Sequence, residues 1–380
     1  MLSYFTMRRL SRLTRKHRHG RDHKLIVWKI QAEDEERLSS APPLEEVAVS
    51  RPVPWILHLL EVNTMNFCSF SACPEPSTTP TESSSVEELL IAVPNTLSSD
   101  AIDIWALPRQ TRIHTISSKP NSGMAMCLSL FAKDDVTFLV SAFENGSVSV
   151  HRSQPNSPWI MTYQSQSHSQ PVLSLAVHPS LDFLLSSSAD SLLVKHPIPS
   201  ALQTTTSATA PSEPRVIEVF GEQITHTDPP TRNVLKAWNH PIKSMNTKHS
   251  GQQSLRIRSD GKIFATAGWD TNVRVYSCKT MKELAVLQWH KVGCYTIAFS
   301  IVDTLQPKDP HQNPSSPIVE SLTSDTIMAP VGGTAVTHLH QRLNRGAGLS
   351  VKESRISRAK ATHWVAAGSK DGKVSLWDIY

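Results

Sequence analysis

A histidine, a hydroxyl residue and an aspartate recur together along this chain. Around Asp190, Ser186 lies four positions before the aspartate and His168 lies about twenty positions before it. These are the residue types of a catalytic triad, in which a carboxylate orients a histidine that takes a proton from a hydroxyl nucleophile. Buried together, the same groups can instead satisfy one another in a hydrogen-bond network that performs no chemistry. Nucleophilic catalysis and structural support are therefore the two interpretations to separate.

The set is repeated, and repetition separates the two interpretations. An aromatic or imidazole residue also lies six positions after each aspartate, and after Asp190 it is His196. The other members of the predicted network are His249, Thr266, Asp270 and Tyr276 in one set, and His290, Asp371 and Trp377 in the last. Ala367 stands at the hydroxyl position of the last set, so that set lacks a nucleophile. Because catalysis needs one complete site rather than several partial ones, we predict a structural network and no enzyme.

Two further sets keep the spacing but not all of the residue types. Asn145 replaces the aspartate between Ser141 and His151. In the first set of the chain, Asp22 is followed by Trp28, but an arginine stands at the hydroxyl position. We interpret both as degenerate copies of one repeated unit.

Short strands must position these residues. Runs of five to seven apolar or alternating residues recur, and each follows another short apolar run and a polar turn, which is the signal of a hairpin. The third-strand candidates are LIVWKI (25–30), AIDIWAL (101–107), SVSVHRS (147–153), LLVKHPI (192–198), VRVYSC (273–278) and VSLWDIY (374–380). Further candidates flank each hairpin, such as RVIEVF (215–220) as a fourth strand. Repeated four-stranded units predict an all-β propeller with six recognisable blades, the first one incomplete.

Composition divides the chain into a leader, a folded body and insertions. Residues 1–24 hold eight bases and one acid, which leaves 30 bases against 32 acids in the remainder. We expect residues 1–19 to be a basic leader outside the fold and residues 20–380 to form the propeller. Segments rich in Pro, Ser and Thr, or in bases, predict flexible insertions at about 72–86, 199–214 and 302–361.

Several classes of function lack their sequence signal. The chain has no run of about 18 apolar residues that could span a membrane. Its five cysteines are scattered, without the close pairing of a zinc site, and predict buried free thiols in a reducing compartment. No basic stripe interleaved with aromatic residues runs through the body. We therefore expect protein partners, with no cofactor, metal or small-molecule substrate and no direct binding of nucleic acid.

One face of the predicted propeller gathers residue types that dominate protein–protein interfaces. The turn between second and third strands and the loop before the first strand share that face in this architecture, and Trp and Arg are enriched in binding hot spots. The candidate partner-binding residues are Arg256, Arg258, Trp269, Trp289, Lys291 and Lys370.

The phrases AGWDTNVRVYS (267–277) and AGSKDGKVSLWD (367–378) resemble WD repeats. Longer stretches, such as HGRDHKLIVWKI (19–30), LRIRSDGKIFATAGWD (255–270) and HWVAAGSKDGKVSLWDIY (363–380), are similar to the fungal ASTRA-associated protein 1 family. The resemblance covers about 20–380 apart from the insertions. It implies a nuclear scaffold subunit of the ASTRA complex, linked to chromatin remodelling and to maturation of phosphatidylinositol-3-kinase-like proteins.

The N-terminus departs from that family. We expect at least one blade to be missing there, so that the chain is truncated relative to a seven-bladed member. A second interpretation is a signalling adaptor that resembles G-protein β subunits. Those subunits carry an N-terminal helix that pairs with a small partner, whereas residues 1–18 contain no coiled-coil heptads.

Overall fold

The computed structural model describes a chain built from antiparallel β-sheets. It describes residues 3–6, 13–19, 23–31, 55–63, 68–76, 88–154, 157–206, 233–301, 355–356, 359 and 362–379. Within these residues no helix is long and apolar enough to cross a membrane.

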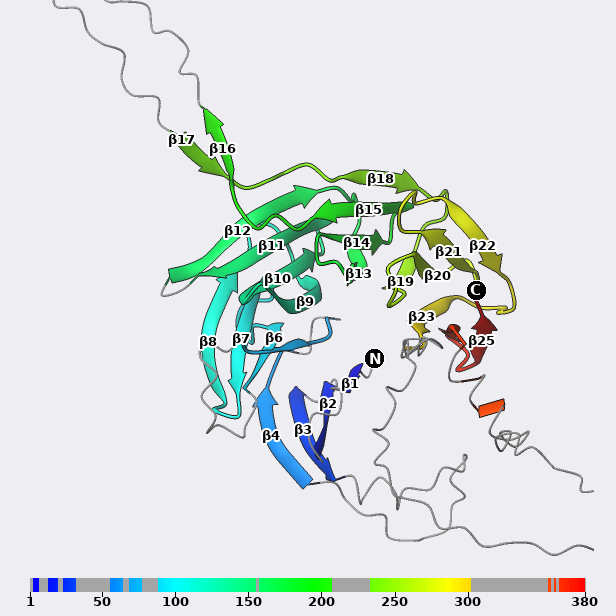
Figure 1. Cartoon of the computed structure of the whole chain (residues 1–380), viewed down its shortest axis with the longest axis horizontal. Helices are drawn as coiled ribbons and strands as arrows, with labels where there is room; N and C mark the ends of the chain where they lie inside the picture. Colours follow the sequence, from blue (N-terminus) through cyan, green and yellow to red (C-terminus); the bar gives the residue numbers. More distant parts are fainter. Residues whose placement is uncertain are drawn as a thin grey trace, which may run out of the picture. The chain divides into compact units, whose positions relative to one another are not determined.

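Among the described residues, six sheets of three or four strands follow one another along the chain, and the strand order within each follows the sequence (Figure 1). The first three sheets are β1 (Ser3–Thr6), β2 (Leu13–His19), β3 (Lys24–Gln31) and β4 (Trp55–Glu61); β5 (Ser71–Pro74), β6 (Leu89–Pro94), β7 (Ala101–Leu107) and β8 (Thr111–Ser117); and β9 (Ala125–Lys133), β10 (Val136–Phe143), β11 (Ser147–Gln154) and β12 (Ser157–Gln166).

The last three sheets repeat the pattern with one insertion. They are β13 (Val172–Val177), β14 (Phe183–Ser188), β15 (Leu192–Pro197) and β18 (Lys243–Asn246); β19 (Gln252–Ile257), β20 (Ile263–Gly268), β21 (Val273–Ser277) and β22 (Glu283–Leu287); and β23 (Cys294–Phe299), β24 (Trp364–Ser369) and β25 (Val374–Asp378). A separate hairpin of β16 (Gln203–Thr206) and β17 (Asn233–Lys236) lies between β15 and β18 in the sequence. The predicted all-β class and repeated blades are confirmed.

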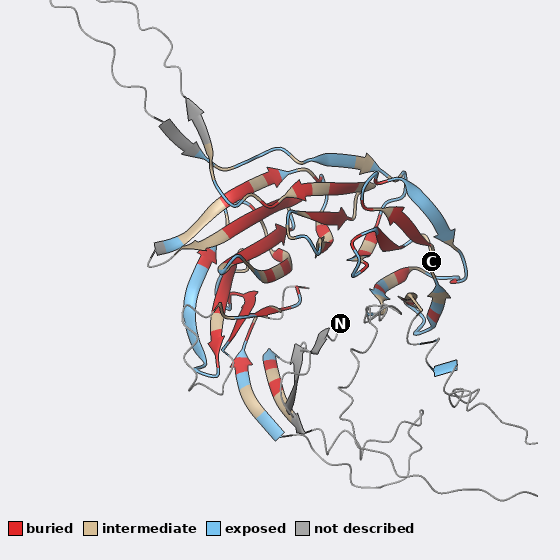
Figure 2. Cartoon of the chain, viewed as in Figure 1, coloured by how far each residue is buried: buried red, intermediate tan, exposed pale blue. Residues whose placement is uncertain are grey.

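The hydrophobic core lies between neighbouring sheets. The first strands contact one another in succession, β5 with β9, β9 with β13, β13 with β19 and β19 with β23. Leu90 and Ile104 of the second sheet share a buried cluster with Leu128 and Phe143 of the third. Burial is concentrated on the inner and middle strands, whereas the outer strands β8, β18 and β22 are largely exposed (Figure 2). Each sheet therefore depends on its neighbour for burial of its apolar face.

The turns that join the strands use residues with the required backbone geometry. Gly146 follows Asn145 in the turn between β10 and β11 and has a φ of +85°. A Cβ atom there would lie 2.2 Å from the carbonyl oxygen of His168. Only glycine fits this close approach, which lets the loop before β13 pack on the preceding sheet.

A small second unit is formed by Ser300–Trp364 and Asp378–Tyr380. In its described part, the backbone N–H of Trp364 donates to Ser300 Oγ at 2.8 Å, and its indole Nε1 donates to the carbonyl of Ala359 at 2.9 Å. The N–H of Ile379 donates to the carbonyl of His363 at 3.0 Å.

The N-terminal segment differs from the sequence-based prediction. Residues 13–19 form β2 and pair with β3 from Leu13↔Gln31 to His19↔Leu25, and β1 pairs with β2. The prediction that residues 1–19 lie outside the fold is therefore wrong. Ladder hydrogen bonds come from the backbone, so a basic composition does not prevent a segment from pairing along the edge of β3.

The insertion boundaries also need correction. Ala72 and Cys73 are buried in β5, so the predicted insertion at 72–86 begins too early, and residues 77–87 lie outside the described residues. β16 begins inside the predicted insertion at 199–214, and the fourth strand beside β15 is β18. The candidate strand at 215–220 and most of the insertion at 302–361 lie outside the described residues.

Candidate functional site

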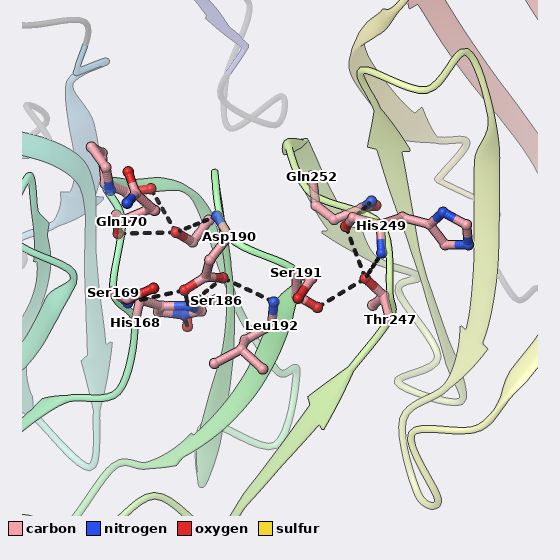
Figure 3. A network of polar contacts seen from close by, with 12 residues as sticks. His168, Ser169, Gln170, Ser186, Asp190, Ser191, Leu192, Thr247, His249 and Gln252 are labelled. Atoms are coloured by element: carbon pink, nitrogen blue, oxygen red, sulfur yellow. Dashed lines mark hydrogen bonds and ion pairs between the residues drawn. The ribbon is translucent and has the colours of Figure 1, made fainter.

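The fourth sheet contains the complete network that the spacing predicts. His168, in the loop before β13, places Nδ1 3.2 Å from both carboxylate oxygens of Asp190 and Nε2 2.8 Å from Ser186 Oγ (Figure 3). Ser186 Oγ lies 2.7 Å from His196 Nε2 on β15, and His196 Nδ1 lies 2.7 Å from the hydroxyl of Tyr163 on β12. The network thus ties the loop and two strands of one sheet to the outer strand of the preceding sheet.

One set of proton positions satisfies every member of this network. Burial lowers the pKa of His196 to about 3, and burial also lowers the pKa of His168 despite the opposing effect of Asp190. Both imidazoles are therefore neutral near pH 7. Tyr163 can donate to His196, His196 to Ser186, Ser186 to His168, and His168 to the carboxylate. The hydroxyl of Ser186 is 0% exposed, which denies a substrate access to the only candidate nucleophile of this set.

The fifth sheet pairs its residues differently from the prediction. Asp270 accepts two hydrogen bonds from the buried guanidinium of Arg274, at 3.1 and 2.6 Å. Thr266 donates to Gln252 Oε1 at 2.7 Å rather than bonding to a histidine. His249 is solvent-exposed, and its Nδ1 lies 3.5 Å from Asp270 Oδ2. The predicted set is thus replaced by an ion pair and a glutamine–threonine bond, because Arg274 outcompetes the exposed histidine for the carboxylate.

The electrostatics of Asp270 reflect that ion pair. Burial alone would raise the pKa of Asp270, but the hydrogen bonds and the charge of Arg274 outweigh burial and lower it. Arg274 Nε also lies 3.6 Å from Glu283 on β22. Asp270 therefore holds a buried cation in place rather than orienting a histidine.

In the sixth sheet the aspartate lies outside the network. His290 Nε2 lies 2.8 Å from Ser375 Oγ on β25, and Trp377 Nε1 donates to the same oxygen at 2.9 Å. Asp371 is exposed and instead bonds to Ser369 and to Lys373, whose Nζ lies 3.2 Å away. The prediction that Asp371 joins His290 and Trp377 is wrong, because a hydroxyl on the third strand takes the role expected of the turn carboxylate.

Sequence reasoning missed the residues that complete these networks. They are Tyr163, Gln252, Arg274 and Ser375. A buried cluster in the second sheet was missed as well, where Asp103 on β7 accepts from Asn95 at 2.9 Å and from Thr115 at 2.7 Å. One signal was available in the sequence of β21. Its single charged residue, Arg274, stands among apolar residues four positions after Asp270.

Two tryptophans of the fifth and sixth sheets lie open to solvent. Trp269, in the turn after β20, is 44% exposed, and Trp289, in the loop before β23, is 54% exposed. Trp289 packs edge-on against His290, with ring centroids 4.9 Å apart. Lys291 and Lys370 are exposed as well. Exposed aromatic rings beside cations are the composition of an interface core with a charged rim.

Backbone hydrogen bonds hold each of these turns close to the loop that enters its blade. The Trp269 N–H donates to the carbonyl of Gly251 at 3.0 Å, and the Lys370 N–H donates to the carbonyl of Gly293 at 3.0 Å. Gly251 has a φ of +73°, and a Cβ atom there would lie 2.2 Å from the Trp269 ring. The indole Nε1 donates to Gln253 Oε1 at 2.8 Å, which fixes the ring over this glycine. We call Trp269, Trp289, Lys291, Val292 and Lys370 the tryptophan surface.

Two of the six predicted partner-binding residues lie elsewhere. Arg258 is buried and pairs with Asp260 through bonds of 3.0 and 2.7 Å, so it is not part of an exposed surface. Arg256 donates to the carbonyl of Leu255 at 2.8 Å and reaches Ser174 Oγ at 3.4 Å. Arg256 is an exposed residue, but its guanidinium lies along the first strands of two sheets and bonds to the chain's own groups there.

The described part of the chain holds no group of three or more His, Cys, Asp or Glu side chains placed to bind a metal ion. Its five cysteines are free. Burial raises the pKa of Cys73, Cys127 and Cys278 to about 12, so these thiols stay protonated.

Comparison with known proteins agrees with the repeat. The model of the WD domain, G-beta repeat, matches residues 154–194, 240–277 and 358–378. Together with the repeated antiparallel sheets, these matches define a WD-repeat β-propeller, and each sheet is one blade.

Longer relatives match most of the chain. ASTRA-associated protein 1 of Verticillium alfalfae is 45% identical over 364 residues, which cover 95% of this chain and 76% of the relative. The protein of the same name from Pyricularia oryzae is 44% identical and covers 95% and 83% of the two chains. The one from Schizosaccharomyces pombe is 31% identical and covers 77% and 78%. The chain belongs to the ASTRA-associated protein 1 family, which confirms the resemblance seen in the sequence.

Proposed function

We propose that this chain is a non-catalytic scaffold that binds protein subunits of an ASTRA-type assembly in the nucleus. The names of the relatives support the association. Participation in chromatin remodelling and in the maturation of phosphatidylinositol-3-kinase-like proteins is part of the proposal. Burial of the one complete His–Ser–Asp set supports the absence of catalysis.

The observation that carries the contact surface is the exposure of Trp269 and Trp289 on neighbouring blades. Exposed large aromatic surface is costly to leave in water, and burying it contributes strongly to association. Lys291 lies two residues after Trp289, and the Lys370 N–H donates to Gly293, which approaches the Trp269 backbone closely. Both cations suit acidic groups at the rim of a partner. The tryptophan surface is therefore the proposed partner-binding face.

Affinity purification of the tagged full chain from its native cells tests the proposal. Trp269→Ala and Trp289→Ala should each reduce recovery of copurifying ASTRA subunits, measured by quantitative mass spectrometry. Trp55→Ala is the matched control, because Trp55 is 74% exposed on β4 of another blade. Wild-type recovery with both alanine variants, at unchanged circular dichroism, would remove the tryptophan surface from the proposal.

A variant that changes only exposed charges tests the same surface without removing an aromatic ring that packs on its neighbours. Lys291→Glu combined with Lys370→Glu changes two exposed side chains. It should lower recovery while the melting temperature stays at the wild-type value. Nuclear localisation is tested by imaging a fluorescent fusion, and a uniform cytoplasmic signal would contradict it.

A further inference from the structure

A cavity of about 300 Å³ lies between the outer strands of the second and third blades. Its walls come from β8 and the two residues after it, from His151 on β11, and from Pro158, Trp159 and Met161 on β12. The volume is at the low end of small-ligand pockets, so it suits a side chain rather than a whole cofactor. None of its residues belongs to the tryptophan surface.

Two polar atoms of the lining side chains have no hydrogen-bond partner. They are Nδ1 of His151, which is buried, and Nε1 of Trp159. A buried donor or acceptor without a partner loses its bonds to water and costs roughly 1–3 kcal/mol. Such groups are uncommon in native proteins, and each one calls for an explanation.

The polar network of the third blade does not explain the histidine. His151 stands at the position that His196 occupies in the fourth blade, where the imidazole bonds to a serine. In the third blade that serine, Ser141, bonds instead to Ser149 at 2.8 Å. His151 is thus released from the repeated network and lines the cavity instead.

The lining offers a hydrogen-bond donor and a positive charge, so it suits a ligand that accepts hydrogen bonds and carries a negative charge. The indole N–H of Trp159 can only donate, and the ring is held edge-on by His114, with centroids 6.0 Å apart. Lys119 is exposed at the cavity and makes no ion pair with the described residues. Apolar atoms of Ile116 and Met161 supply the remaining wall. A carboxylate on a short apolar stem matches this combination.

The neighbouring strand favours a peptide as the source of that carboxylate. β8 is the edge strand of its sheet and, among the described strands, pairs with β7 alone. Its residues Thr111–Thr115 are exposed. An edge strand presents backbone N–H and C=O groups to which an extended peptide can add, with alternate side chains turned toward a neighbouring pocket.

We propose that the cavity binds an extended acidic peptide segment of a partner protein. The peptide pairs along β8 and places a Glu or Asp carboxylate against Trp159 Nε1 and Lys119 Nζ. The site lies on blades two and three, so it is independent of the partner-binding face proposed on blades five and six.

Fluorescence polarisation with defined peptides tests the site on the full chain. The probes are three fluorescein-labelled octapeptides in which Glu alternates with Val, Leu or Tyr, each paired with a counterpart in which Gln replaces every Glu. At least one acidic peptide should bind about tenfold more tightly than its Gln counterpart, because hydrogen bonds to a charged acceptor are the stronger ones. Equal binding of all pairs, or no binding of any acidic peptide, overturns the proposal.

Matched variants locate the binding. Trp159→Phe keeps an aromatic ring but removes the N–H, and Lys119→Glu reverses the charge, so each should weaken binding of the acidic peptide about tenfold or more. Trp55→Phe and Lys279→Glu alter an exposed tryptophan and an exposed lysine of other blades and should bind as wild type does. Full affinity in Trp159→Phe and Lys119→Glu contradicts the assigned site.

Discussion

Replacement of Asp270 by alanine should destabilise the fifth blade strongly, because it leaves a cation buried without its main partner. The Arg274 side chain is 3% exposed and donates two hydrogen bonds to Asp270. Removal of one partner of a fully buried pair costs about 3–5 kcal/mol. The Asp270 side chain is 28% exposed, and Glu283 remains 3.6 Å from Arg274 Nε, so solvent and a second carboxylate reduce that cost. We expect a loss of about 2–3 kcal/mol.

The assay is urea unfolding followed by circular dichroism and tryptophan fluorescence. Asp371→Ala is the matched control, because Asp371 occupies the same turn position in the sixth blade but is exposed and bonds to Ser369, whereas His290 and Trp377 bond to Ser375. Its unfolding midpoint should equal that of wild type. Adding Arg274→Met to Asp270→Ala should recover part of the lost stability, since the pair is then replaced by apolar atoms. Equal midpoints for Asp270→Ala and Asp371→Ala would refute the assignment of Arg274 as the residue that Asp270 serves.

Three further outcomes follow from the described contacts. Tyr163→Phe removes the donor to His196 and should cost about 1–2 kcal/mol in urea unfolding, whereas an unchanged midpoint would show that the two blades are not coupled through this bond. Gly251→Ala strains a φ of +73° and displaces the Trp269 ring, so it should lower the melting temperature and shift the tryptophan emission; wild-type emission would contradict the close packing. Burial lowers the pKa of His151 to about 4 and of His196 to about 3, below the value of about 6.5 in the unfolded chain. The unfolded state therefore binds more protons, and the unfolding midpoint should fall as pH drops from about 6.5 toward 4, while a midpoint that stays level over that range would contradict neutral buried imidazoles.

Local patterns in the sequence determined the class of fold and one of the networks. Alternation of apolar residues specifies strands, polar turns specify hairpins, and their repetition specifies blades, because each of these depends on neighbours within a few residues. The set of His168, Ser186 and Asp190 was predictable for the same reason. Strand pairing brings Ser186 of β14 beside the loop and turn that hold the other two side chains.

Only the tertiary structure determined which donor each acceptor bonds to. His249, in the loop before β19, and Arg274, on β21, both come within reach of Asp270. Arg274 is buried and His249 is exposed, so the carboxylate pairs with the cation that is shielded from water. Arg258 is likewise removed from the surface by a neighbouring aspartate.

The N-terminal strands and the cavity between blades two and three could not be predicted from residue types and spacing. β2 pairs with β3 through backbone groups that nearly every residue type carries, so the basic composition of this segment did not predict that it forms a strand. His151 keeps the spacing of the repeat, yet the bond between Ser141 and Ser149 leaves it without a partner beside Trp159. Spacing along a chain determines which side chains lie on neighbouring strands, whereas burial and the competition between nearby donors, which exist only after the blades pack, determine which of them bond.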